Sequence, residues 1–343
     1  MVIEKARDAG FWKRVRTEEA YRPFCEELAA MWEKECGIPV PACKYSEFII
    51  YNQNGSRKEY EKSYFLRRRQ MNVSALLALI YPDDPTYMDY LCDVLWAILD
   101  EYVWVLPAHM PSFSKTVAEH IDLFSAETGF ALSEICYLLG ERLPELIRSR
   151  ICTEVEKRIF KAYQNNTYWW ERCTNNWAAV CLCGVVGAYI YQAPEKLEEL
   201  MPRIRKTAAN FLSGFSKDGV CLEGFEYWHY GFGFFTCMAD MLYDFTDGAV
   251  DFFEDEKVAR IASRDKLSRT FSSNSQKIHK KRCQKHRMAP DTSFDRLHFS
   301  VQQVFAEIRI VWQLVDIWLP APLDFRQFQR IGFLQCMIVA CHI

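Results

Sequence analysis

The segment NWAAVCLCGVVGAYIY, residues 176–191, is apolar on nearly every side of the helix that it predicts. A helix that is apolar all round belongs in a protein interior, because no polar face is left for water. We therefore expect residues 176–191 to form a buried helix, with other helices packed around it.

Around this segment, apolar residues recur at helical spacing up to about residue 263, as Ile121, Phe124, Leu132 and Ile135 do. No convincing strand alternation is present in this part of the sequence. The sequence therefore predicts an all-α fold of stacked antiparallel helical hairpins. A closed helical toroid and a solenoid both fit, although no fixed repeat favours a common solenoid. The other predicted helices span 17–36, 73–81, 86–105, 120–140, 143–163, 194–212 and 231–245.

The composition excludes several classes of protein. The chain has 343 residues, enough for one large domain or two ordinary ones, and it is 50% hydrophobic and 25% charged, as soluble globular proteins are. A net charge of −3 gives no nucleic-acid signature, and no apolar run reaches the roughly 18–20 residues of a membrane helix. Charges stand where a signal peptide needs its apolar segment, so we expect a cytoplasmic protein without a membrane partner.

The sequence also lacks the usual cofactor motifs. The 14 cysteines are scattered and mostly lie among apolar residues, as small buried side chains do. Cys181 and Cys183 would point to different faces of one helix, which argues against zinc or a disulfide. No His-Glu-x-x-His set, phosphate loop, dinucleotide fingerprint or Gly-x-Ser-x-Gly elbow is present, so we expect neither a metal nor a cofactor.

Two charged segments have alternative interpretations. The run Arg67-Arg-Arg69 favours a solvated face or rim, which would help to hold an anionic polymer if it faced a cleft. Residues 264–287 carry nine Lys or Arg against one acidic residue, and the apolar runs after them lack clear caps. We divide the chain into 1–263 and an atypical tail, 264–343. The tail is a nucleic-acid-binding arm, a disordered linker with a small helical segment, or the translation of an altered reading frame, which is the interpretation we favour.

Asn175 and Asn176 open the predicted central helix. One asparagine is explained as the N-cap, which accepts a hydrogen bond from the first helical turn. The other would then stand at a helix N-terminus, which favours negative charge, with its amide able to donate to an anion.

The second candidate segment is DGVCLEGFEYWHYGFGFF, residues 218–235. Asp218-Gly219 is a turn signal, and Gly231 and Gly233 indicate a close backbone approach or a crowded helix start. Tyr227 and Tyr230 would share a helix face, where a tyrosine of lowered pKa can act as general base or acid. Two core tyrosines with satisfied hydroxyls are the plainer interpretation, and His229 between them is structural or catalytic.

A third segment, Trp104-Val-Leu-Pro-Ala-His109, ends in a histidine that follows a helix end and a proline. A loop histidine at such a place can reach into a cleft. It is considered together with His120-Ile-Asp122 further along the chain.

These segments together resemble the heparinase II/III-like family of polysaccharide lyases. The resemblance rests on 104–109, on His120 to Thr128, on Thr174-Asn-Asn-Trp177, and on Asp218-Gly with Glu223 to Gly231, and it covers roughly residues 10–262. It implies an α/α toroid followed by an antiparallel β-sandwich, with the substrate in the cleft between them. It also implies β-elimination on polysaccharides that contain uronic acid, so the expected partner is an anionic poly- or oligosaccharide.

The resemblance assigns roles to single residues. Asn176, with Asn175 second, would neutralise the uronate carboxylate and stabilise the enolate-like intermediate. Tyr227 would be the base or acid, with Tyr230 as the alternate. The remaining residues would line the cleft, stack on sugars or support the site: His109, His229, Trp177, Trp228, Glu223 and Trp104.

The sequence departs from the family near residue 263, because the last 80 residues do not read as strands. The resemblance therefore predicts an incomplete toroid whose β-sandwich is missing or truncated, with weak or absent lyase activity. Two alternatives stay open. One is a carbohydrate-binding helical domain without catalysis, and the other is a helical interaction scaffold that uses Arg67 to Arg69 and the basic segment.

Overall fold

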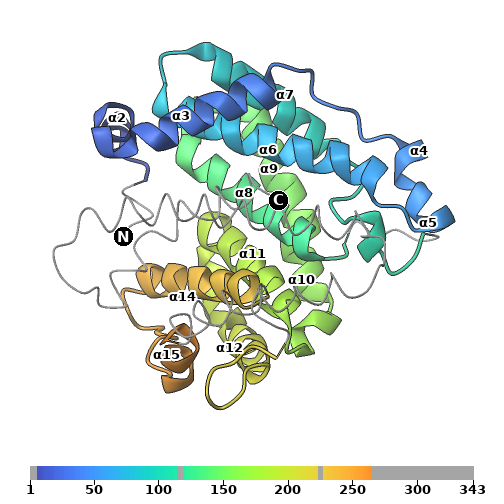
Figure 1. Cartoon of the computed structure of the whole chain (residues 1–343), viewed down its shortest axis with the longest axis vertical. Coiled ribbons are helices and arrows are strands. Elements are labelled where there is room, and N and C mark those ends of the chain that lie inside the picture. Colours follow the sequence, from blue (N-terminus) through green and yellow to red (C-terminus); the bar gives the residue numbers. More distant parts are fainter. Residues whose placement is uncertain (1–5, 114–116, 118, 223–226, 264–343) are drawn as a thin grey trace, which may run out of the picture.

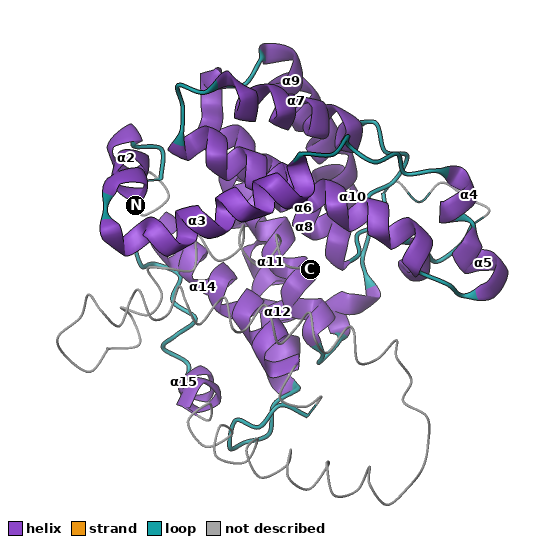
Figure 2. Ribbon diagram, turned by 45° about the horizontal axis from the view of Figure 1, so that its top comes forward, coloured by secondary structure: helices purple, strands orange, loops and turns teal. Residues whose placement is uncertain are grey.

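The computed structural model describes residues 6–113, 117, 119–222 and 227–263 (Figure 1). Every regular element in these residues is a helix, apart from one antiparallel bridge between Phe215 and Cys221. Figure 2 shows the same all-helical arrangement from a second side. The predicted all-α class is therefore confirmed for the described part of the chain. The tail 264–343, and the interpretations offered for it, lie outside the described residues.

The N-terminal helices pack on one long helix, α6. They are α2 (Ala9–Thr17), α3 (Arg22–Met31) and the π-helix Trp32–Cys36, and each of them contacts α6 (Lys58–Ile80). The predicted helix over 17–36 is present, but it is broken into the 3₁₀ turn Glu19–Tyr21, α3 and the π-helix. Two short helices, α4 (Tyr45–Phe48) and α5 (Ile50–Asn54), precede α6.

Helix α6 begins earlier than the predicted 73–81 and places the arginine run inside the protein. Arg67 and Arg68 are only 8% and 7% exposed, so the interpretation as a solvated rim is wrong for them. Both terminal nitrogens of Arg68 donate hydrogen bonds to the Glu101 carboxylate at 2.6 Å, and Arg67 Nη1 donates to the same carboxylate at 3.0 Å. Arg69 pairs with Glu35 through Nε at 2.9 Å. Charges can be buried here because each has its partner.

Helix α7 (Pro85–Leu99) packs on α6 but ends earlier than the predicted residue 105. The backbone carbonyls of the residues after α7 accept hydrogen bonds from a side chain and not from the next helical turn. Arg158 donates to the Glu101 carbonyl at 2.7 Å and to the Tyr102 carbonyl at 3.3 Å. The chain then runs through the buried residues 103–107 to the 3₁₀ turn Pro107–His109.

The centre of the molecule is the pair α8 (Leu123–Leu139) and α11 (Asn176–Gln192), which make extensive contact. Nearly every residue of α11 is buried, as its all-apolar sequence predicts. Along the chain, the elements that separate α8 from α11 are the 3₁₀ turn Gly140–Arg142, α9 (Glu145–Val155), the π-helix Glu156–Phe160, α10 (Lys161–Asn165) and the 3₁₀ turn Trp169–Arg172.

Three further helices follow α11. The 3₁₀ turn Pro194–Lys196 leads into α12 (Leu197–Ser213), and the π-helix Trp228–Phe232 leads into α14 (Gly233–Phe245); both α12 and α14 contact α11. Helix α15 (Glu256–Ser263) closes the described chain. One hydrophobic core runs from Ala6 to Ile261, so these helices form a single packed body. Among the described helices, none is both long and apolar enough to cross a membrane.

Candidate functional site

A buried carboxylate, Asp122, orients His109. Asp122 is 0% exposed and is the N-cap of α8, where its Oδ1 accepts from the Ser125 backbone at 2.7 Å in a capping box. Its Oδ2 accepts from the Leu106 backbone at 3.2 Å and lies 2.8 Å from His109 Nδ1. This geometry makes Nδ1 the donor to Asp122 and leaves Nε2 as the nitrogen that can exchange a proton. The sequence singled out both residues, and the structure adds the bond between them.

Aromatic rings surround His109. The Phe124 ring stacks on the imidazole at a centroid distance of 5.7 Å, and Trp177 meets its edge at 4.8 Å. Trp177 in turn contacts Trp169 at 4.8 Å, and Trp169 is 51% exposed. A path of aromatic surface therefore leads from the His109 imidazole to the solvent.

The charges of Asp122 and His109 also act on His120. Burial lowers the pKa of its imidazole, as does the neighbouring His109, while the Asp122 carboxylate raises that pKa. His120 therefore favours the neutral form more than an exposed histidine does.

The N-terminus of α11 brings Asn175 and Asn176 to this place. Asn175 is the N-cap and accepts from the Trp177 backbone at 3.2 Å, which confirms that one asparagine is a cap. Asn176 is 6% exposed. A Cβ added to Gly231 would lie 3.1 Å from the Cα and Cβ of Asn176. The predicted close backbone approach is therefore confirmed at Gly231, whereas a Cβ on Gly233 would meet nothing within 4 Å.

Tyr230 and Glu127 form a second pair, and Glu127 is the residue that sequence reasoning missed. The Tyr230 hydroxyl donates to Glu127 Oε1 at 3.0 Å. Burial raises the pKa of Glu127 to about 8, helped by Asp122 and opposed by the Tyr230 hydrogen bond. Burial, with the Glu127 charge second, raises the pKa of Tyr230 well above its usual value. The available signal was a carboxylate between Ala126 and Thr128 in a mostly apolar helix.

The two candidate tyrosines have different surroundings. Tyr227 is 51% exposed, whereas Tyr230 is half-buried and bound to Glu127. Tyr227 directly precedes the widened π-helical turn Trp228–Phe232, whereas Tyr230 lies within it. Glu223 lies outside the described residues, as do the side chains of Trp228 and His229.

Trp104 is placed differently from its predicted role. Its side chain is 1% exposed, and its indole N–H donates to the Ile98 carbonyl at 3.2 Å. The Arg158 guanidinium lies 4.7 Å from the ring centroid. With its ring covered and its donor satisfied, Trp104 is a core residue and does not contact a ligand.

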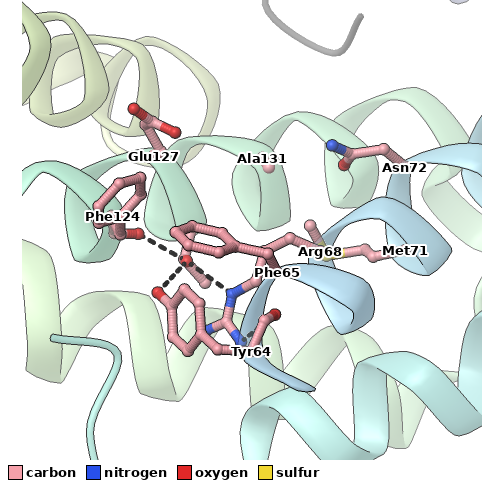
Figure 3. Close-up of a pocket in the computed structure, with 9 residues that line it drawn as sticks. Tyr64, Phe65, Arg68, Met71, Asn72, Phe124, Glu127 and Ala131 are labelled. Carbon is pink, nitrogen blue, oxygen red and sulfur yellow. Dashed lines mark hydrogen bonds between the residues drawn. The ribbon is translucent and has the colours of Figure 1, made fainter. Parts of the chain in front are cut away.

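A small pocket opens between α6 and α8, with Glu127 on its wall (Figure 3). Phe65 and Arg68 line it from α6, and Phe124 and Ala131 from α8. Its free volume is about 20 Å³, which holds little more than one water molecule. A sugar ring does not fit this pocket.

Metal-ligating side chains do not gather in groups of three or more anywhere in the described part of the chain. Comparisons of the chain with protein-family models and with curated proteins found no match.

Proposed function

We propose that this chain is the helical part of a polysaccharide lyase that acts by β-elimination on saccharides containing uronic acid. One observation carries the proposal: three chain segments that are far apart in the sequence, 104–109, 120–128 and 174–177, meet at His109. The π-helix Trp228–Phe232 packs against two of these segments, because Tyr230 donates to Glu127 and Gly231 lies against Asn176. Together these parts of the chain hold the groups that an elimination needs: a held imidazole, asparagines at a helix N-terminus and tyrosine hydroxyls.

The reaction would proceed as follows. A base removes the C5 proton beside the uronate carboxylate, the C4–O4 bond breaks as the C4=C5 double bond forms, and an acid protonates the departing oxygen. The C5 proton is weakly acidic until the charge of the carboxylate is met by donors. Asn176 and the N-terminus of α11 would supply these donors, because a helix N-terminus favours an anion.

Within this proposal Tyr227 is the base, and Tyr230 is the alternate. Tyr227 is half exposed, so a polymer on the surface can reach its hydroxyl. The Tyr230 hydroxyl donates a hydrogen bond to Glu127, which makes Tyr230 better suited to hold the site together than to collect a proton from C5. His109, fixed by Asp122, would face the sugar between Phe124 and Trp177.

The fold that goes with this proposal is an α/α toroid over residues 1–263. The hairpin-like neighbours α6–α7, α8–α9 and α11–α12, each in contact, are compatible with such a ring.

A carbohydrate-binding domain without catalysis is the second candidate. The exposed Trp169 packed against Trp177 favours it, because such rings can stack on sugars whether or not a reaction follows.

The test is a lyase assay on the full chain with heparin, heparan sulfate and alginate, which follows the ultraviolet absorbance of the unsaturated uronate product. We expect turnover that falls by about 10²–10⁴ in Tyr227→Phe, as for loss of a general base. Tyr45→Phe is the matched control, because Tyr45 is 75% exposed on α4 and takes no part in the site.

The outcomes separate the candidates. Turnover that Tyr227→Phe abolishes would support the lyase and the role of Tyr227 as its base. Saccharide binding without product, unchanged in Tyr227→Phe and lost in Trp169→Ala, would favour the binding domain. Neither binding nor product with any of these polymers would contradict both.

A further inference from the structure

The 3₁₀ turn Trp169–Arg172 lies at the outer end of the aromatic surface that leads away from His109. Trp169 and Arg172 are the first and last residues of this turn, and both side chains are exposed. One turn of a 3₁₀ helix takes three residues, so the side chains at i and i+3 lie on the same side. The indole of Trp169 and the guanidinium of Arg172 therefore project from one side of the turn.

The two middle residues of the turn fix it to the protein. Trp170 is 0% exposed, and its indole N–H donates to the Ile121 carbonyl at 2.9 Å. The Glu171 carboxylate accepts hydrogen bonds from Arg203 at 2.6 and 2.7 Å and from the Tyr168 backbone N–H at 2.6 Å. The exposed pair thus stands on a rigid base, which favours binding because less freedom is lost when a ligand is held.

The charge of Arg172 is available to a ligand. Among the described residues, no carboxylate forms an ion pair with Arg172. Arg203, by contrast, is already bound to Glu171 and to the carbonyls of Tyr163 and Asn166. A planar guanidinium can donate two parallel hydrogen bonds to one carboxylate, so Arg172 offers a site for an acidic group.

The ring of Trp169 supplies the second element of this surface. It contacts Trp177 at a centroid distance of 4.8 Å, and Trp177 contacts the His109 imidazole at the same distance. A uronate sugar has apolar C–H faces and a carboxylate at its edge. An indole beside a cation matches both features, whereas a neutral sugar would use the indole alone.

We propose that Trp169 and Arg172 form a subsite that binds one uronate unit of an anionic saccharide, with the sugar ring on the indole and the carboxylate on the guanidinium. This inference rests on the saccharide binding of the proposed function, which both of its candidates share, and it does not need the elimination. The subsite holds a unit further along the saccharide than the unit at His109. Arg172 is then the residue that makes the chain prefer acidic to neutral saccharides.

The test measures binding to the full chain by isothermal titration calorimetry, with oligomannuronate and with a mannan oligosaccharide of the same length and linkage. These two ligands differ in the carboxylate. We expect oligomannuronate to bind more tightly, and Arg172→Gln to raise its Kd by about three- to tenfold without changing the Kd for mannan. Trp169→Ala should weaken the binding of both ligands. Arg16→Gln, at an exposed position of α2, is the matched control and should change neither Kd.

Salt gives a second measurement on the same proteins. Salt screens the attraction between exposed charges, so an increase from about 0.05 to about 0.5 M should reduce the preference of the unmodified chain for oligomannuronate over mannan. The same increase should change this preference little in Arg172→Gln, because the cation that salt screens has been removed.

Several outcomes would overturn the subsite: an equal Kd for oligomannuronate in the unmodified chain and in Arg172→Gln, equal binding of the acidic and neutral ligands, or no binding of either. The lyase assay on the same samples tests the proposed function separately. Binding that depends on Arg172, without unsaturated product, would keep the subsite and contradict the lyase. Product formed with the same KM in Arg172→Gln would keep the lyase and contradict the subsite.

Discussion

Buried carboxyl groups make the stability of this protein depend on pH at the scale of single residues. Glu134 of α8 is 1% exposed and accepts from the Tyr191 hydroxyl at 3.2 Å. Burial raises its pKa from 4.5 to about 8. The folded state therefore binds more protons than the unfolded state between these values, and the free energy of unfolding falls as pH rises through them. The raised pKa of Glu127 likewise makes the free energy of unfolding fall as the pH rises.

We predict that Glu134→Gln reduces this slope. The glutamine oxygen can still accept from Tyr191, and no carboxyl group remains to ionise. Urea unfolding at several pH values between 4.5 and about 8 checks it: the variant should gain stability relative to the unmodified chain toward the upper end. Glu254→Gln, at an exposed position, should leave the slope unchanged. An equal slope in the unmodified chain and in Glu134→Gln would contradict the prediction.

Some residue roles could be predicted from the sequence, and others could not. The Asn175 cap and the close approach at Gly231 follow from local rules, because a cap and a glycine contact reflect the backbone near that residue. The Tyr230–Glu127 bond joins residues 103 positions apart, so no local pattern encodes it. The buried Arg68–Glu101 pair could not be predicted for the same reason, because an arginine run alone resembles a solvated surface.

The contact between α8 and α11 depends on glycine at the scale of elements. A Cβ on Gly184 would lie 2.6 Å from the Ala126 carbonyl carbon and 2.7 Å from its oxygen. These are backbone atoms of α8, so they cannot turn aside as a flexible side chain can. The two helices would have to separate locally.

We predict that Gly184→Ala lowers the free energy of unfolding by about 1–3 kcal/mol, as overpacking does. Gly233→Ala is the matched control, because Gly233 is exposed at the start of α14 and the added methyl meets nothing within 4 Å. Its better helix propensity should stabilise the protein by about 0.5–1 kcal/mol. Denaturant unfolding of both variants checks the pair, and equal effects of one sign would refute the role assigned to Gly184.

Helix positions were predictable where apolar periodicity is undisturbed, as in α8 and α11. Their ends were less so, because tertiary partners decide them. Helix α6 runs back to Lys58 through the charged segment 67–69, whose arginines pair with the distant Glu101 and Glu35. Helix α7 stops where the Arg158 side chain donates to two backbone carbonyls. Arg68 lies 33 positions from Glu101, and Arg158 lies 56 positions from Tyr102.

At the scale of the whole molecule, the sequence predicts the all-α class because helical periodicity alone separates it from strands. Closure into a toroid depends on the angles between successive hairpins, which periodicity does not carry. The structure adds that one core joins the N-terminal helices to α15. Distant parts of the described chain are thus expected to support the same folded state.

This continuous core leads to the last prediction. Leu95 of α7 is 0% exposed and Phe235 of α14 is 1% exposed, and both belong to the same cluster although they lie in different parts of the fold. Leu95→Ala should lower the free energy of unfolding by about 2–5 kcal/mol, and Phe235→Ala should lower it by about 3–5 kcal/mol. Both lose buried apolar surface and leave a cavity behind. Leu222→Ala, at a side chain that is 73% exposed, should cost little.

Because the core is shared, either substitution should lower the midpoint of one common thermal transition, seen alike by tryptophan fluorescence and by far-ultraviolet circular dichroism. Two independently packed halves would behave differently. Leu95→Ala would then shift one transition and Phe235→Ala another, and the two probes would separate. That separation would show that the contacts between α8 and α11 do not couple the N-terminal helices to α14.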